Sequence, residues 1–238
     1  MTNELSVLLP AAASVALLHT LLGPDHYLPF IAMSKARHWS LRKTALVTFM
    51  CGGGHVISSV VLGLTGVGFG VALTRLEALQ SFRGNASAWA LMTFGLVYGT
   101  WGLRKSMRDR PHRHLHVHEN GQTHLHEHTH HNKHIHAHVA KGQQQNITPW
   151  ILFTMFLFGP CEPLIPLLMY PAANSSLTGL VSLTAVFATT TIITMMTIVL
   201  LSTLGIKLLP VSKLDRYSHA LAGATILMCG VSIQFLGL

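Results

Sequence analysis

Four ionisable residues lie inside the first two long apolar segments of the chain. His19, Asp25 and His26 lie close together, and His55 follows three consecutive glycines. Ionisable side chains within apolar, membrane-length segments are costly, so by default they mark a binding site or a path for ions. Three imidazoles and a carboxylate suit nickel, cobalt, zinc, iron or manganese, and the set lacks the thiolates that favour copper(I). The alternative is an interfacial helix cap at Asp25 and His26 and a hydrogen bond between helices at His55.

The spacing of His19 and His26 sets a condition on any ion that they share. On an intact helix, residues seven positions apart share a face but lie about 10 Å from each other. Two nitrogens that bind one ion, each about 2.1 Å from it, are at most about 4.2 Å apart. Pro24, after Gly23, can break the helix because proline lacks an N–H group and clashes with the preceding turn. We therefore predict a broken first helix, with Asp25 as a ligand or as the partner of a ligating imidazole.

A second concentration of histidine lies in the middle of the chain, in runs where every second residue is histidine. Low-complexity tracts of this kind bind metal through imidazole nitrogen. The segment has few apolar residues, so we expect no independent fold. The alternative is a solvated linker without a function of its own. The predicted metal-gathering residues are His112, His114, His116, His118, His124, His126, His128, His130, His131, His134, His136 and His138.

The elements that must position these residues are membrane helices. Of the 238 residues, 50% are hydrophobic and 10% are charged, whereas a soluble domain carries about 25% charged residues. No nucleic-acid partner is expected from the net charge of +8, because the charges cluster at the ends of apolar runs. Six segments approach the roughly 20 residues that a span needs: 5–33, 44–73, 87–104, 148–172, 177–204 and 217–237.

The positive charges alternate between the connections. Lysine and arginine cluster after the first, third and fifth segments, and only Arg75 and Arg83 lie elsewhere. Positive charge marks the cytoplasmic side of membrane proteins. We predict a multi-pass protein of the cell inner membrane, with the histidine-rich loop in the cytoplasm and both chain ends outside. The expected partners are the lipid bilayer and a metal substrate, and a homo-oligomer is left open.

Two sequence patterns of the first half of the chain recur in the second half. The Gly-Pro step at Gly23 recurs at Gly159, 136 positions later, and the pattern that begins at Gly95 recurs at Gly230, 135 positions later. With three spans in each half, the halves must have opposite orientations, which is a common transporter plan. We predict an all-α integral membrane protein with six transmembrane helices as 3+3 inverted repeats and with helices 1 and 4 broken. The predicted units are residues 1–104, a disordered loop 105–147, and residues 148–238.

The first two segments resemble a known family. His19, Asp25 and His26 look like the His-x4-Asp-His signature in an early helix of the nickel/cobalt transporter family, and Gly54-His55 with Ser58 looks like its later Gly-His-Ser element. The resemblance covers residues 15–65 and departs in one way, because five residues separate His19 from Asp25. It implies a transport role for the three histidines and Asp25. It also implies a divalent metal as substrate and no prosthetic group.

The fourth segment is similar to a different group. Gly159-Pro160-Cys161-Glu162 looks like a motif of the membrane thiol-electron carriers and their sulfite-exporter-like relatives, in which each half of a carrier offers one cysteine. Here Asp25 stands in the first half, so the dithiol is missing. A thiol-redox carrier or anion exporter is therefore the alternative function. Cys161 and Glu162 either complete the metal site or serve as an apolar cysteine and a capping glutamate.

The leading interpretation is transmembrane transport of a divalent transition-metal cation, nickel or cobalt first. The cytoplasmic histidine-rich loop slightly favours export. The other two cysteines, Cys51 and Cys229, form no CxxC pair. The sequence carries no hydrolase constellation or phosphate-binding loop, so no enzymatic activity is expected.

Overall fold

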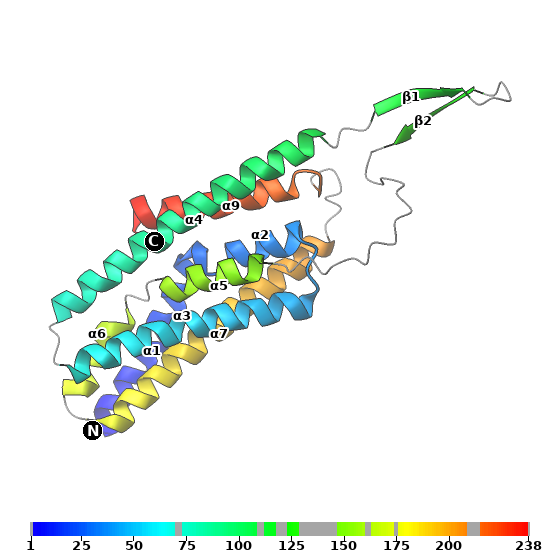
Figure 1. The fold of residues 1–238 in the computed structure, drawn as a ribbon. Helices are drawn as coiled ribbons and strands as arrows, with labels where there is room; N and C mark the ends of the chain where they lie inside the picture. Colours follow the sequence, from blue (N-terminus) through cyan, green and yellow to red (C-terminus); the bar gives the residue numbers. More distant parts are fainter. Residues whose placement is uncertain are drawn as a thin grey trace.

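The computed structural model is a bundle of long helices (Figure 1). It describes residues 2–69, 73–108, 112–117, 123–128, 147–159, 163–173, 176–208 and 215–237. The first half contains α1 (Thr2–Leu22), the 3-10 helix η1 (Pro24–His26), α2 (Leu28–Ala36), α3 (Leu41–Gly68) and α4 (Leu73–Arg108). Strands β1 (His112–Val117) and β2 (Thr123–His128) follow. The second half contains α5 (Thr148–Phe158), α6 (Leu164–Ala173), α7 (Leu177–Leu208) and α9 (Ser218–Leu236).

Four helices are long and apolar enough to cross a membrane, namely α1, α3, α7 and α9. They also expose large hydrophobic side chains, such as Phe49 at 55% and Ile193 at 64%. A helix that is hydrophobic all round is either buried in a core or spans a membrane. These helices indicate a membrane-embedded protein. Two of the six predicted segments differ from this group, because α4 carries several charges and α5 has only 11 residues.

Both predicted helix breaks are present, between α1 and α2 and between α5 and α6. The third segment was predicted too short, since α4 begins at Leu73 and not near residue 87. Its first turns contain Arg75, Glu77 and Arg83, and hydropathy does not register a helix of mixed charge. The ends of α2, α4 and α7 lie toward the end of the bundle that carries β1, and the N-terminus lies toward the other end (Figure 1).

The closest helix contact joins α4 to α9 through glycine. A Cβ added at Gly95 would lie 2.8 Å from the carbonyl oxygen of Gly223, and one at Gly230 would lie 2.7 Å from that of Ala88. Real Cβ atoms do not approach backbone so closely, so these positions require glycine. Small residues at helix interfaces are typical of membrane bundles, where backbone packing replaces the hydrophobic driving force.

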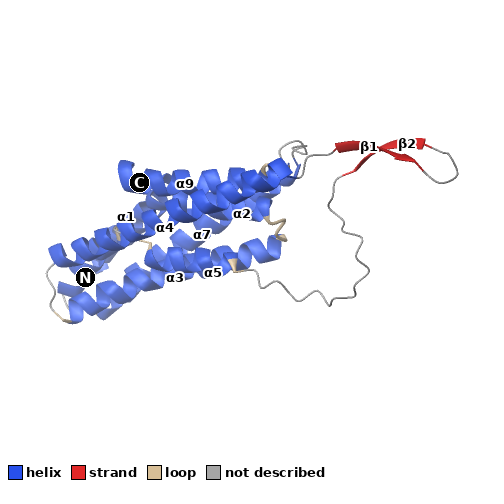
Figure 2. Cartoon of the chain, turned by 45° about the horizontal axis from the view of Figure 1, so that its top comes forward, coloured by secondary structure: helices blue, strands red, loops and turns tan. Residues whose placement is uncertain are grey.

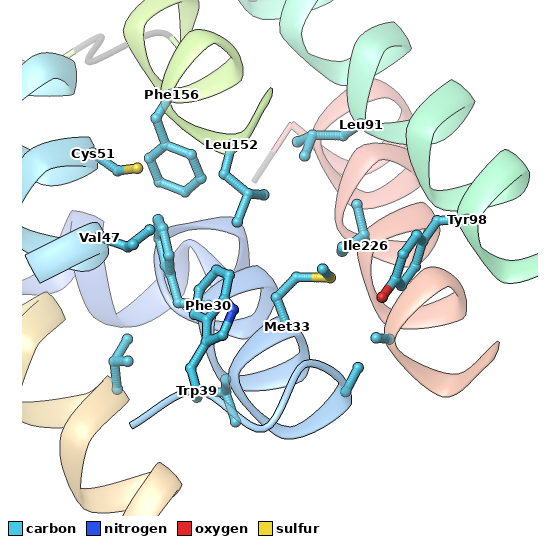
Figure 3. Close-up of a cluster of buried hydrophobic side chains, with 14 of the residues drawn as sticks. Phe30, Met33, Trp39, Val47, Cys51, Leu91, Tyr98, Leu152, Phe156 and Ile226 are labelled. Carbon is cyan, nitrogen blue, oxygen red and sulfur yellow. The ribbon is translucent and has the colours of Figure 1, made fainter. Parts of the chain in front are cut away.

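Short helix α2 lies among the long helices, as Figure 3 shows. Phe30 and Met33 of α2 are fully buried and belong to one cluster with Phe156 of α5 and Ile226 of α9. The ring centroids of Phe30 and Phe156 are 4.6 Å apart. Cys51 of α3 is 1% exposed in the same cluster. This packing holds the two half-length helices α2 and α5 next to the break in the first.

The histidine-rich loop contains two short strands, where the sequence predicted no regular structure (Figure 2). Its alternating pattern has the two-residue period of a strand, which accounts for the difference. The antiparallel register pairs histidine with histidine at His112 and His128, at His114 and His126, and at His116 and His124. The other six predicted metal-gathering residues lie outside the described residues.

Candidate metal site

The break in the first helix is built by Gly23 and Pro24. Helix α1 ends at Leu22, and Gly23 adopts an extended conformation with ψ 92° before the 3-10 turn. Pro24 has no N–H group for the carbonyl of Thr20, which an unbroken helix would require. The hydroxyl of Tyr27 donates to the carbonyl of Leu21 at 3.3 Å. The chain therefore changes direction inside the bundle while part of its freed backbone remains hydrogen-bonded.

The break brings three histidines together. The ring centroid of His26 lies 4.7 Å from that of His19 and 5.1 Å from that of His55 on α3. One ring nitrogen from each residue lies within 4.8 Å of the other two. Nitrogens on one ion are at most about 4.2 Å apart, so a small rotation of the rings would let all three bind one ion.

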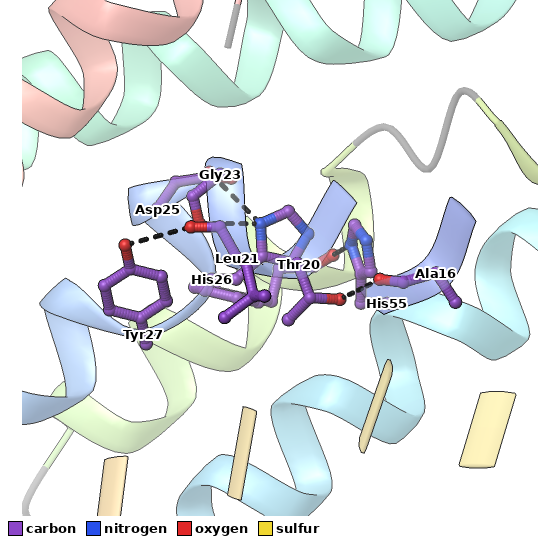
Figure 4. A network of polar contacts seen from close by, with 9 residues as sticks. Ala16, Thr20, Leu21, Gly23, Asp25, His26, Tyr27 and His55 are labelled. Carbon is purple, nitrogen blue, oxygen red and sulfur yellow. Dashed lines mark hydrogen bonds and ion pairs between the residues drawn. The ribbon is translucent and has the colours of Figure 1, made fainter. Parts of the chain in front are cut away.

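Hydrogen bonds leave the same nitrogen available on His26 and His55. Nδ1 of His26 lies 3.2 Å from the carbonyl oxygen of Gly23 and 3.2 Å from a carboxylate oxygen of Asp25. Nδ1 of His55 lies 3.3 Å from the carbonyl oxygen of Phe156. Because these partners only accept hydrogen bonds, Nδ1 carries the proton of each neutral ring, which leaves the lone pair on Nε2. Figure 4 shows the contacts around Gly23, Asp25 and His26.

All three Nε2 atoms are buried without a partner in the described part of the chain. His26 and His55 are each 2% exposed, and His19 is half-buried. Buried polar atoms of native proteins are almost always hydrogen-bonded, and each exception calls for an explanation. Three such exceptions on neighbouring rings are explained together if the rings bind one cation.

Asp25 lies beside His26 and outside the group of three converging nitrogens. A carboxylate that accepts a hydrogen bond from the far nitrogen of a ligating histidine fixes the tautomer of the ring and raises its basicity. Of the two predicted roles, ligand or partner, this geometry favours the partner. Its negative charge would also offset part of the charge of a bound cation.

Each helix break has a glycine that lies tightly against a histidine ring. A Cβ at Gly23 would lie 2.5 Å from Nδ1 of His26, and one at Gly159 would lie 3.1 Å from Nδ1 of His55. These are the two glycines that the internal repeat relates. The second break therefore packs against the site, although its own side chains contribute none of the three imidazoles.

Arg83 of α4 was not identified from the sequence. Its guanidinium donates to the hydroxyl of Ser58 at 2.9 Å and to the carbonyls of Leu157 at 2.9 Å and Gly159 at 3.4 Å. The Ser58 hydroxyl donates to the carbonyl of His55 at 2.9 Å. Arg83 thus ties the last turn of α5 to the turn of α3 that carries His55. An arginine beside a predicted span was the only sequence signal for it.

Two predicted site residues remain, and one histidine of α9 was not among the predicted site residues. Cys161 and Glu162 lie outside the described residues, so their predicted contribution stays a prediction. His219 on α9 is described and differs from the cluster, because Nδ1 lies 2.8 Å from the Tyr98 hydroxyl and Nε2 lies 3.5 Å from Nζ of Lys105. Both of its ring nitrogens therefore have a neighbour.

No family model, no curated protein and no solved structure matches the chain. The function is therefore inferred from the residues and their geometry.

Proposed function

We propose that the protein carries a divalent transition-metal cation across the membrane and that His19, His26 and His55 hold the ion on its way. Two observations carry this proposal: one ring nitrogen from each histidine lies within 4.8 Å of the other two, and Nε2 of each ring is buried without a partner in the described residues. Three imidazoles suit nickel, cobalt, zinc, iron or manganese. The resemblance of the first two segments to nickel/cobalt transporters puts these two metals first.

The position of the site supports transport over permanent storage. The three histidines lie where a helix is broken inside the bundle, and broken helices are the usual substrate sites of transporters. Along α3, Thr48, His55 and Ser59 follow at intervals of seven and four residues, which places them on one helix face. The hydroxyls of Thr48 and Ser59 are buried and have no partner in the described residues. These hydroxyls would offer the moving ion oxygen ligands on either side of His55.

We further propose six spans arranged as two inverted repeats of three. In support, α1 packs on α7 while α5 packs on α3, and α2 packs on α7 while α6 packs on α3. A Cβ at Gly95 would meet the backbone nitrogen of Leu227, and one at Gly230 would meet that of Met92. Gly230 lies 135 positions after Gly95, and Leu227 lies 135 positions after Met92, so each contact is the repeat counterpart of the other. Such reciprocal contacts are expected of a two-fold axis.

The charge pattern supports an orientation in the cell inner membrane with the histidine-rich loop in the cytoplasm and both chain ends outside. The paired histidines of β1 and β2 would gather metal at the inner mouth, and this placement slightly favours export. A resident cofactor and an enzymatic activity are not part of the proposal. The bilayer and the metal ion are the proposed partners.

The alternative of a thiol-redox carrier or anion exporter rests on Cys161, which lies outside the described residues. Of the described cysteines, Cys51 and Cys229 are buried and form no disulfide. A thiol carrier should lose function on Cys161→Ala and keep it when the three histidines are replaced. A metal transporter should show the opposite pattern.

The decisive experiment measures metal flux in proteoliposomes that contain the full chain. Nickel, cobalt and zinc would be offered separately to the wild type, to a His19/His26/His55 triple-alanine variant and to His219→Ala as a control. We expect flux of at least one metal in the wild type and in His219→Ala, and none in the triple variant. Equal flux in all three proteins would refute the proposed site.

A further inference from the structure

A hollow of about 300 Å³ between α2 and α7 is separate from the histidine cluster. It lies near the end of the bundle where both helices end. Lys35, His38 and Lys207 contribute to its wall. Nζ of Lys35 is 2.6 Å from a carboxylate oxygen of Asp215, and Lys207 adds a second ammonium group. Asp215 offsets the charge of Lys35, so Lys207 gives this wall a net positive charge, which disfavours a metal cation and favours an anion.

The same hollow is lined by two buried donors without partners. Trp39 is 3% exposed and Thr203 is 5% exposed. Neither Nε1 of Trp39 nor Oγ1 of Thr203 has a hydrogen-bond partner in the described residues. An indole N–H can only donate, so it needs an acceptor. Because both atoms are buried, a small movement of each side chain is needed before it can donate to an acceptor in the hollow. Together with the two lysines, these groups then suit a ligand with several negatively charged oxygens.

The wall is completed by the residues that follow α2. His38 has a positive φ of 49° just after the C-terminal end of α2. The amide of His38 donates to the carbonyl of Lys35 at 3.3 Å, and the amide of Trp39 donates to the carbonyl of Ser34 at 3.0 Å. Helices commonly end in this way, usually with glycine at the residue of positive φ. The helix end therefore places His38 and Trp39 in the wall of the hollow.

An apolar hollow of about 270 Å³ adjoins the first. The two share Ile31, Lys35 and Ile206 as wall residues. The second hollow continues between α2 and α9, and it is lined mainly by carbon: Leu28, Ala32, Leu221 and Ala222. Leu221 is 48% exposed, so this groove opens onto the apolar surface of the bundle. A ligand that fills both hollows has an anionic head and an apolar tail.

We propose that the two hollows bind one anionic phospholipid. Its phosphate lies between Lys35 and Lys207 and accepts hydrogen bonds from Trp39 and Thr203, and an acyl chain follows the groove between α2 and α9. Basic pockets between membrane helices on the cytoplasmic side are known to take anionic lipid head groups. A soluble anion would use the polar hollow but would leave the adjoining apolar groove unexplained.

The test measures lipid binding to the full chain by native mass spectrometry. Detergent-solubilised protein would be titrated with phosphatidylglycerol, with phosphatidylcholine of the same acyl chains, and with inorganic phosphate. The variants are Lys207→Gln, which removes one ammonium group, and Thr203→Val, which removes one hydroxyl at nearly constant volume. The matched controls are Arg42→Gln, an exposed basic residue outside both hollows, and Thr189→Val on the same helix as Thr203.

We expect the wild type to prefer phosphatidylglycerol. Lys207→Gln should reduce that preference roughly fivefold, the usual effect of one basic residue on an anionic lipid, and Thr203→Val should also weaken binding. Both controls should behave as wild type. Equal binding of the two lipids would overturn the proposal. Phosphate binding that depends on Lys207 and Thr203, without any preference between the lipids, would assign the hollow to a soluble anion instead.

The lipid proposal and the proposed metal transport can fail separately. Metal binding at the histidine cluster uses none of the residues that line the two hollows. Thermal unfolding of Lys207→Gln and Thr203→Val in detergent shows whether these variants are folded, and it depends on neither metal binding nor lipid binding.

Discussion

The two halves of the bundle have the same kind of helix break but different side chains around it. In the first half, His19 and His26 flank the break and His55 faces it from α3. An offset of 136 places Met155 and Thr191 at the positions of His19 and His55 in the second half. The second half instead supplies backbone, through the carbonyl of Phe156 that accepts from His55. A helix break of the same kind is therefore not accompanied by the same side chains in the two halves.

The difference has a physical basis in the cost of buried polar groups. Each intramembrane imidazole without a partner is unfavourable unless it binds something. Thr191 is fully buried, and its hydroxyl also lacks a partner in the described residues. A hydroxyl, however, can turn back to the carbonyl of its own helix, as Thr189 does at 2.7 Å. Because all three imidazoles come from the first half, the cost of burying imidazoles without partners falls on that half alone.

The largest expected effect is on metal transport, and it should differ between histidine variants of the first half and variants at the equivalent positions of the second half. His26→Ala or His55→Ala should reduce metal affinity by more than about 100-fold and abolish flux, because replacing even an outer partner of a ligand costs about 10- to 100-fold. Met155→Leu and Thr191→Val, at the equivalent positions, should retain flux. Radiometal uptake by proteoliposomes would measure both. Loss of flux in the second-half variants at normal protein stability would show that both halves bind the ion.

The next effect tests the reciprocal contacts between the halves. Gly95→Ala and Gly230→Ala each place a Cβ against backbone of the opposite helix, and we expect each to destabilise the bundle by about 1–3 kcal/mol. Gly53→Ala is the control, because nothing lies within 4 Å of its Cβ position. Thermal unfolding in detergent would compare the three. A large loss for only one of the two α4–α9 variants would contradict the proposed two-fold relation.

A smaller effect is expected at Arg83, which positions His55 without being a predicted ligand. Arg83→Lys keeps the charge but cannot reach Ser58, Leu157 and Gly159 at once, since an ammonium lacks the planar fork of a guanidinium. We expect metal affinity to fall about tenfold, the lower end for partners of ligands. Arg75→Lys, on the same helix, is the matched control. The absorption spectrum of bound cobalt should shift in Arg83→Lys, and an unchanged spectrum and affinity would limit Arg83 to a purely structural role.

The sequence predicted those parts of the candidate site that depend on residues close to one another in the chain. Pro24 after Gly23 marked the break, and the position of His19 and His26 on either side followed from helix geometry. Arg83 and the Phe156 carbonyl could not be found in this way, because they reach His55 and its neighbours from helices distant in the chain. The early start of α4 was missed for another reason. Hydropathy measures apolarity, and a helix that carries Arg75 and Glu77 does not register as a span.

The smallest expected effect concerns the histidine-rich loop. Its predicted role is to gather metal, whereas the three bundle histidines are predicted to hold the ion during transport. Deletion of residues 112–138 should leave the maximal rate of transport unchanged. It should raise the metal concentration for half-maximal flux by up to about tenfold, equivalent to about 1.4 kcal/mol, because ions would no longer be gathered near the inner mouth. A loop of full length with glutamine at the six strand histidines is the matched control and should behave like the deletion. If the deletion abolished flux in a well-folded protein, the loop would be part of the transport path, and the three bundle histidines would not suffice to move the ion.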